Sequence, residues 1–235
     1  MPSSIPGLQQ VSILTFDIFG TVLDLTGSIT PPSRRFLERK GAAVSAEVFW
    51  DQWRARQRIE QYQDSLMQLG HAGYLETCRR ALVYCLRLNA IAFTDAEVRD
   101  LMQSWQSLTP HADVAEGLRR LRPRFKLVAL SNGEQPYLEH LERERMRFGF
   151  EAIISVQRAG VFKPHPAVYR TGAMMLGVEP QQIMMVAAHS FDIMGARACG
   201  FRGAYVNRYR LPYEESPYRP DVETRDFIEL ADVLT

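Results

Sequence analysis

The sequence predicts an α/β fold in which a doubly wound parallel sheet is interrupted by an inserted helical subdomain. Short apolar runs of strand length recur along the chain, and helical stretches separate them. The runs are unbroken rather than alternating, which indicates strands that are covered on both faces, as in parallel sheets. Strands that alternate with helices are typical of doubly wound α/β domains. One long stretch, residues 26–108, instead has helical periodicity and few strand signals.

Each predicted strand is bounded by polar or turn-forming residues, and each predicted helix follows such a strand or precedes the next. The predicted strands are Val11–Phe16, Leu127–Leu130, Ile153–Val156, Ile183–Ala188 and Ala204–Val206. The predicted helices between them are Val114–Leu121, Pro136–Glu144, Pro166–Met175 and Ile193–Cys199.

The inserted stretch contains two amphipathic patterns, Val48–Leu69 and Gly73–Leu88, and a third helix start at Thr94. We therefore expect a Rossmann-like core domain, residues 1–25 and 109–235, and a helical cap subdomain, residues 26–108. A helical insert after the first strand would lie over the carboxyl ends of the sheet, where open α/β sheets bind ligands.

The composition is that of a soluble globular protein. The 235 residues carry a formal net charge of +1, so they lack the positive charge expected of a nucleic-acid-binding protein. No apolar run approaches the roughly 20 residues of a membrane helix, and the N-terminal MPSSIPGLQQ does not resemble a signal peptide. The cysteines, Cys78, Cys85 and Cys199, are odd in number and form no CxxC pair, which favours buried thiols in a reducing compartment and a cytoplasmic location.

Polar side chains follow four of the predicted strands. Each is also typical of a turn or a helix cap when taken alone. Because the carboxyl ends of parallel strands share one edge of the sheet, we expect all of them to meet there. The segments are Asp17 to Thr21, Ser131-Asn132-Gly133, Lys163-Pro164, and His189 to Asp192.

The strings FDIFGT, LSNG, Lys163-Pro164 and AAHSFD resemble the four motifs of the haloacid dehalogenase superfamily, and the helical insert occupies that superfamily's cap position. Within the superfamily, the chain is most similar to the type II (S)-2-haloacid dehalogenases. The resemblance extends from Ile13 to the C-terminal PDVETRDFIELADVL and therefore covers nearly the whole chain.

The chemistry of two positions favours this subgroup over the phosphatases of the superfamily. A phosphatase of this superfamily has a proton-donating Asp two positions after its nucleophile, where this chain has Phe19. An alkoxide leaving group needs that acid, whereas a halide ion is a weak base and does not. Asp192 is the lone acid of its motif, which makes a poor Mg²⁺ site. We expect no metal and no cofactor.

The resemblance also implies a role for each polar residue of the core. Asp17 is the nucleophile that forms an ester with the substrate, and Thr21 holds its carboxylate. Ser131 and Lys163 position Asp17 and the substrate carboxylate, and Tyr169 supports this network through a hydrogen bond. Asp192 is the base, or the orienting group, for the water that cleaves the ester.

The halide site is likewise implied by the resemblance. Asn132 and, from the cap, Arg54 match halide-contacting residues, and Phe191 lines the pocket. The chain departs from the better-known members by having Ala187-Ala188-His189 in place of Ser-Ser-Asn. His189 then orients the hydrolytic water or donates a proton near it, or it shapes a tight pocket for fluoride, or it is a hydrogen-bonded residue with no special role.

These observations predict hydrolytic dehalogenation of small (S)-2-haloalkanoic acids to (R)-2-hydroxy acids through an Asp17 ester. The preferred halogen and chain length stay open. The alternatives are hydrolysis of another small 2-substituted carboxylate, such as azetidine-2-carboxylate, a Mg²⁺-dependent phosphatase, and a non-catalytic relative. The only partners expected are the small-molecule substrate and, by resemblance, a second copy of the chain in a homodimer, with neither nucleic acid nor membrane.

Overall fold

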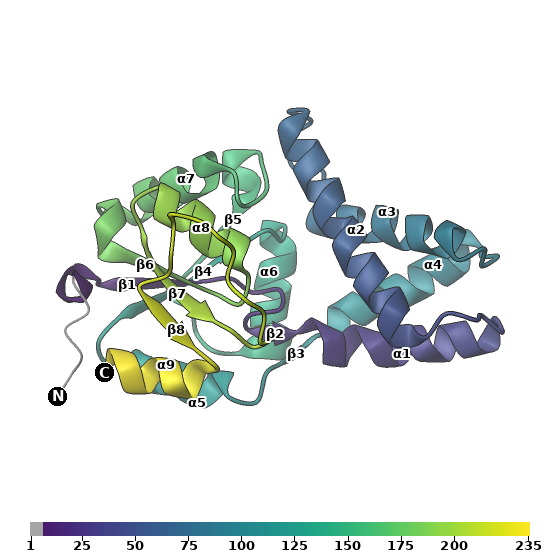
Figure 1. Ribbon diagram of the computed structural model, residues 1–235, viewed down its shortest axis with the longest axis horizontal. Coiled ribbons are helices and arrows are strands. Elements are labelled where there is room, and N and C mark those ends of the chain that lie inside the picture. Colours follow the sequence, from purple (N-terminus) through teal and green to yellow (C-terminus); the bar gives the residue numbers. More distant parts are fainter. Residues whose placement is uncertain (1–6) are drawn as a thin grey trace. The chain divides into compact units, whose positions relative to one another are not determined.

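The computed structural model describes residues 7–235. The prediction that the N-terminal segment is not a signal peptide concerns residues 1–10, of which residues 1–6 lie outside the described residues. The chain divides into two compact units (Figure 1). The first comprises the residues up to Leu23 together with Pro110–Thr235, and the second is Asp24–Thr109. Within the described part, no helix has the length and hydropathy of a membrane-spanning segment.

The first unit is built on a six-stranded sheet with the order β5-β4-β1-β6-β7-β8. Every pairing between neighbouring strands is parallel, which confirms the predicted doubly wound α/β fold. The order reverses at the central strand β1, which creates the switch point where such sheets bind ligands. The strands are β1 (Ile13–Phe16), β4 (Lys126–Ser131), β5 (Ala152–Ser155), β6 (Ile183–Ala187), β7 (Arg202–Val206) and β8 (Val222–Thr224).

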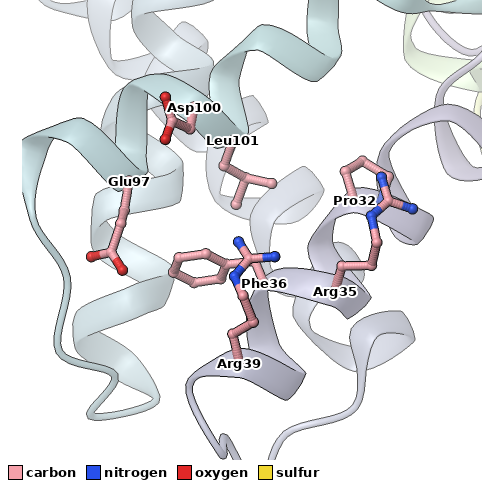
Figure 2. Close-up of a pocket in the computed structure, with 7 residues that line it drawn as sticks. All are labelled: Pro32, Arg35, Phe36, Arg39, Glu97, Asp100 and Leu101. Atoms are coloured by element: carbon pink, nitrogen blue, oxygen red, sulfur yellow. The ribbon is translucent and has the colours of Figure 1, made fainter.

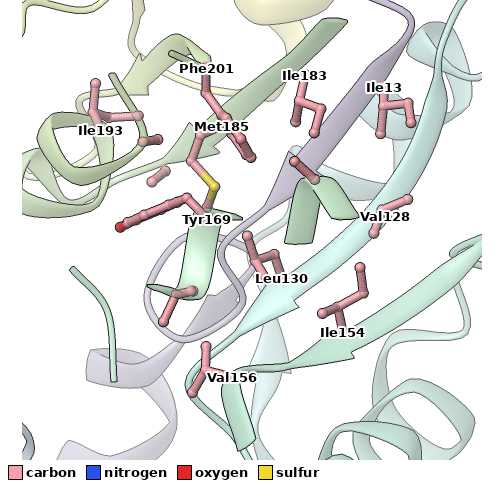
Figure 3. Packing of buried hydrophobic residues seen from close by; sticks show 14 of the residues in the cluster. Ile13, Val128, Leu130, Ile154, Val156, Tyr169, Ile183, Met185, Ile193 and Phe201 are labelled. Carbon is pink, nitrogen blue, oxygen red and sulfur yellow. The ribbon is translucent and has the colours of Figure 1, made fainter. Parts of the chain in front are cut away.

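Both faces of this sheet are buried. On one face, alternate strand residues such as Leu130 and Met185 pack with α7 (Pro166–Leu176) and α8 (Ser190–Ala198), as Figure 3 shows. On the other, the ring of Phe16 stacks on Phe227 with 5.6 Å between their centroids. Burial of one large apolar side chain stabilises the fold by about 1.5–3 kcal/mol, so these two layers hold the strand ends in place.

Helices complete the first unit. The helices α5 (Val114–Leu121) and α9 (Phe227–Leu234) pack against each other, below the sheet in the view of Figure 1. The helix α6 (Gln135–Leu141) continues into a π-helical turn, Glu142–Met146. Three short 3₁₀ turns lie at Leu8–Gln10, Val156–Ala159 and Pro180–Gln182.

The second unit is helical. It holds α1 (Leu25–Arg39), α2 (Ala46–Leu66), α3 (Tyr74–Leu88), α4 (Asp95–Met102) and the 3₁₀ turn Gln103–Ser107. The strands β2 (Leu23–Asp24) and β3 (Thr109–Pro110) pair where the chain leaves and re-enters the first unit. Hydroxyl groups cap two of the helices: Ser45 accepts from Val48 N, and Thr94 forms a capping box with Glu97.

Aromatic side chains form the core of the second unit. Trp53 is fully buried and lies with Trp105 at a centroid distance of 5.9 Å, edge to face. The indole of Trp53 donates to the carbonyl oxygen of Cys78 at 2.7 Å. Cys78 and Cys85 are buried free thiols as predicted, whereas Cys199 is only partly buried. Burial raises the pKa of Cys85 to about 12, so this thiol stays protonated at neutral pH.

A pocket of about 200 Å³ opens between α1 and α4 of the second unit (Figure 2). Arg35 and Arg39 of α1 and Glu97 and Asp100 of α4 line it. It contains none of the residues for which the sequence predicts a catalytic or binding role.

Two helical glycines of the first unit provide a matched test of packing. A Cβ on Gly117 of α5 would lie 2.6 Å from the carbonyl oxygen of Phe227, whereas one on Gly172 of α7 would lie 3.6 Å from Leu130. We expect Gly117→Ala to destabilise the fold by about 1–3 kcal/mol through overpacking. Gly172→Ala should instead be neutral or stabilising by up to about 1 kcal/mol. Urea denaturation of both variants measures the change in the free energy of unfolding. Equal changes in the two variants would contradict the tighter packing at Gly117.

Candidate active site

The carboxylate of Asp17 lies directly beyond β1, at the switch point of the sheet. The backbone N–H of Asp17 donates to the carbonyl oxygen of Val186 at 3.0 Å, which extends the pairing of β1 with β6 by one residue. The Thr21 hydroxyl donates to Asp17 Oδ2 at 2.7 Å and accepts from the N–H of Ala188 at 2.8 Å. Because the Thr21 hydroxyl is held from both sides, it fixes the orientation of the Asp17 carboxylate.

The ammonium group of Lys163 lies between two carboxylates. Its Nζ is 2.7 Å from Asp192 Oδ2 and 3.6 Å from Asp17 Oδ1, and it donates to the Leu130 carbonyl oxygen at 2.6 Å. The Lys163 side chain is 1% exposed. The Lys163 backbone N–H donates to Asn132 Oδ1 at 2.9 Å. The ends of β1, β4 and β6 are thus connected through one buried cation.

The second carboxylate, Asp192, lies in the first turn of α8. The buried Tyr169 hydroxyl donates to Asp192 Oδ1 at 2.7 Å, so each oxygen of this carboxylate accepts from one donor. A Cβ on Gly195 would lie 2.7 Å from the Tyr169 oxygen. Glycine at this point of α8 therefore leaves room for Tyr169 to reach Asp192.

The ring of His189 contacts the Asp17 carboxylate directly. Its Nδ1 lies 3.2 Å from Asp17 Oδ2, and the side chain is 6% exposed. The ring centroid is 5.4 Å from that of Phe191 and 6.1 Å from that of Tyr209. Gly20 has a φ of +94°, and a Cβ there would lie 2.9 Å from the His189 ring. Glycine thus both adopts the left-handed backbone and leaves room for the histidine.

Charge and burial set opposite pKa shifts on the two carboxyl groups. Burial by itself raises the pKa of Asp17, but the Lys163 charge and the contacts from His189 and Thr21 hold it well below its usual range. Burial raises the pKa of Asp192 to about 6; the Lys163 charge opposes this shift and the charge of Asp17 adds to it. At neutral pH the site therefore presents an ionised Asp17 beside a carboxylate that readily exchanges a proton.

The two carboxylates of the site face the same cation. Both carboxylates already share the ammonium of Lys163, and within residues 7–235 no group of three acidic, histidine or cysteine side chains is arranged to hold a metal ion.

The remaining predicted residues fall into two groups. Ser131 ends β4, with its Oγ 3.5 Å from Gly133 N, and Phe191 begins α8 beside His189. Arg54 belongs to the second unit, where its Nη1 donates to Gln57 Oε1 at 2.8 Å. The core residues that the structure brings together are Asp17, Thr21, Ser131, Asn132, Lys163, Tyr169, His189, Phe191 and Asp192.

A family model of haloacid dehalogenase-like hydrolases matches residues 11–200, which is most of the chain and includes all four motif segments. The chain belongs to the haloacid dehalogenase-like hydrolases.

Two curated relatives of this hydrolase are named (S)-2-haloacid dehalogenases. The protein from Xanthobacter autotrophicus is 32% identical over 200 residues, which cover 85% of this chain and 76% of the relative. (S)-2-haloacid dehalogenase H-109 from Pseudomonas putida is 29% identical over 229 residues, which cover 97% and 99%.

A solved structure of a 2-haloacid dehalogenase is similar in fold over nearly the whole chain. The L-2-haloacid dehalogenase from Xanthobacter autotrophicus with chloropropionic acid covalently bound is 27% identical and has a TM-score of 0.83. The superposition covers 95% of this chain and 98% of that chain.

Two residues for which the sequence predicts no role hold the segment from Asp17 to Thr21. Tyr209 OH donates to the carbonyl oxygen of Gly20 at 2.9 Å, and Arg208 Nε donates to that of Thr21, also at 2.9 Å. Arg208 also pairs through both terminal nitrogens with Asp113, at 2.9 and 2.8 Å. No motif signals this pairing, because its partners lie far apart in the sequence and any surface ion pair would look the same.

We expect Arg208→Met to destabilise the hydrolase by about 1–3 kcal/mol, because it leaves the half-buried Asp113 carboxylate and the Thr21 carbonyl short of donors. The matched control is Arg119→Met, since Arg119 pairs with Glu116 on the surface and both side chains are exposed. That variant should stay within about 0.5 kcal/mol of the parent. Urea denaturation at pH 7 compares the two variants. An unfolding midpoint that stays unchanged in Arg208→Met would show that the contacts of Arg208 with Asp113 and Thr21 contribute nothing to stability.

Proposed function

We propose that this hydrolase dehalogenates small (S)-2-haloalkanoic acids to (R)-2-hydroxy acids through an ester on Asp17. The observation that carries the proposal is a buried carboxylate, ionised and fixed by Thr21 and Lys163, with a phenylalanine where a phosphatase needs an acid. The names of the relatives and the covalently bound chloropropionic acid in the Xanthobacter autotrophicus enzyme support the same chemistry.

In the first step, an Asp17 oxygen attacks C2 of the substrate from the side opposite the halogen. The carbon–halogen electron pair leaves with the halide, and no proton is needed. Phe19 fits this step, because its buried ring packs on Tyr137 at a centroid distance of 5.8 Å and offers only hydrocarbon. We assign Asn132 and Arg54 to the halide and Phe191 to the pocket wall.

In the second step, water attacks Cγ of the Asp17 ester. Asp192 takes the water proton and later returns it to the departing alkoxide, so that the products are the 2-hydroxy acid, halide and one proton. Lys163 has three N–H donors, of which two bond to Leu130 O and Asp192 and the third faces Asp17. Because these contacts occupy the ammonium group, we assign Lys163 to the two carboxylates, and we assign the substrate carboxylate to Ser131 and the backbone near it.

The competing functions lack a supporting observation. A phosphatase needs an acid at position 19 to protonate its alkoxide leaving group, and this site has the buried ring of Phe19 there. Ring opening of azetidine-2-carboxylate would use the same ester chemistry, and it becomes the next candidate if no haloacid releases halide. The homodimer, the cap role of the second unit and the cytoplasmic location stay predictions.

The decisive test is halide release from fluoroacetate, chloroacetate and (S)-2-chloropropionate in the presence of EDTA. We expect halide and hydroxy acid in equal amounts, with (R)-lactate from the last substrate. Asp17→Asn should abolish turnover, because an amide is a very poor nucleophile. The variant should still fold, although less stably, because Lys163 keeps its contact with Asp192. Halide release by Asp17→Asn, or release only with added Mg²⁺, would contradict the mechanism; no release from any haloacid would shift the function to another 2-substituted acid.

The pH profile tests the assignment of Asp192. Because burial raises its pKa to about 6 and only the ionised form accepts a proton, kcat should fall as the pH drops through about 6. Tyr169→Phe removes a donor that favours the ionised form, so this acidic limb should move to higher pH. Tyr205→Phe, which loses only a 3.3 Å hydrogen bond to Asn207, is the control. A limb that stays in place in Tyr169→Phe would argue against Asp192 as the base.

A further inference from the structure

We propose that His189 is a catalytic residue of the second step, where its Nδ1–H and the Thr21 hydroxyl stabilise the negative charge that develops on Asp17 Oδ2. The inference rests on the proposed function and deepens it, because it assigns the two donors to ester hydrolysis rather than to ester formation.

Two donors converge on one oxygen of the nucleophile. Thr21 Oγ1 lies 2.7 Å and His189 Nδ1 lies 3.2 Å from Asp17 Oδ2. An ionised carboxylate offers only acceptors, so the histidine nitrogen that faces it carries a hydrogen. Both side chains are buried and held by neighbours: Thr21 by the Ala188 N–H, His189 by the rings of Phe191 and Tyr209.

The other carboxylate oxygen of Asp17, Oδ1, has a different environment. Its nearest charged neighbour in the described part of the chain is the Lys163 ammonium at 3.6 Å, which is too long for a hydrogen bond. The lone pairs of Oδ2 are drawn into two hydrogen bonds, and those of Oδ1 are more available for attack. Asp17 Oδ1 therefore forms the bond to C2 of the substrate, and Oδ2 becomes the carbonyl oxygen of the ester.

This assignment determines where charge appears next. When the water oxygen bonds to Cγ, the π electron pair of the ester carbonyl moves onto Oδ2, and the water proton goes to Asp192. Collapse re-forms the carbonyl, breaks the Cγ–Oδ1 bond and releases Oδ1 with the product, which regains a proton from Asp192. Donors already in place around Oδ2 stabilise this tetrahedral intermediate without reorganisation, as in other oxyanion holes.

The alternative position for the histidine, beside the attacking water as its base, fits less well. His189 Nδ1 faces an acceptor, and the opposite edge of the ring lies over Gly20, where a Cβ would be 3.2 Å from Nε2. Asp192 lies at the same site, buried, and its raised pKa suits it to accept the proton. The geometry thus assigns proton transfer to Asp192 and hydrogen-bond donation to His189.

Single-turnover kinetics with (S)-2-chloropropionate separate the two steps. Chloride release reports formation of the ester, and mass spectrometry of the Asp17 peptide reports its decay. In His189→Ala, we expect chloride release to change less than about threefold and ester decay to slow by about 10²-fold, the usual effect of losing one oxyanion donor. The modified peptide should therefore accumulate.

Two conservative variants distinguish a lost donor from a disturbed fold. The amide nitrogen of asparagine is as many bonds from the backbone as the Nδ1 of histidine, so His189→Asn should restore ester decay to within about tenfold of the parent. His189→Gln places its donor one bond further and should decay slowly. His140→Ala, which removes a histidine of α6 that has no place in the site, is the control and should leave both steps unchanged.

The outcomes are distinct for the two proposals. Unchanged ester decay in His189→Ala, equal slowing of both steps, or equal decay in the Asn and Gln variants would overturn the assignment of His189 while leaving the dehalogenase function intact. No halide release by the parent enzyme from any haloacid would overturn both.

Discussion

The site depends on one buried ammonium group. Lys163 lies between Asp17 and Asp192, and a partner-less charge in such a place costs several kcal/mol. The cation makes it possible to bury two carboxylates together, and each carboxylate in turn justifies burial of the cation. Because the three groups come from the residue after β1, from the segment after β5 and from α8, the charge balance forms only when the sheet is correctly assembled. Folding and the ionisation of Asp17 are therefore coupled.

The sheet order explains why these groups meet. Since β4 and β6 flank β1 on opposite sides, the chain that follows each of them arrives next to Asp17. The carbonyl oxygen of Leu130, in β4, accepts from Lys163, and the backbone of Ala188, just beyond β6, donates to Thr21. Main-chain groups at the ends of two strands thus orient the side chains on both sides of Asp17.

The sequence predicted those parts of the fold in which local pattern and tertiary environment agree. The apolar strands and helices such as Val114–Leu121 follow directly from periodicity, and the polar strand ends did mark the residues that meet. The sequence predicts no separate helix over Leu25–Arg39, where Pro31 and Pro32 each remove a backbone hydrogen bond. In the structure this helix forms and buries Ile29 and Phe36. The helix Phe227–Leu234 is short and nearly all apolar, and periodicity alone cannot tell such a run from a strand. The contacts of Arg208 with Asp113 and Thr21 could not be predicted for a different reason: these residues lie far apart in the sequence and meet only in the folded chain.

The contrast between carbon–halogen and phosphate ester cleavage reduces to the basicity of the leaving group. An alkoxide needs an acid beside the nucleophile that can donate a proton to the leaving oxygen. A halide removes the need, so position 19 can be filled by a ring that packs on Tyr137 and is 2% exposed. Exclusion of water from this side leaves the Lys163 charge less screened and keeps solvent from competing for the nucleophile. The loss of one proton donor and the presence of a dry, ion-paired Asp17 are therefore two aspects of a single chemical requirement.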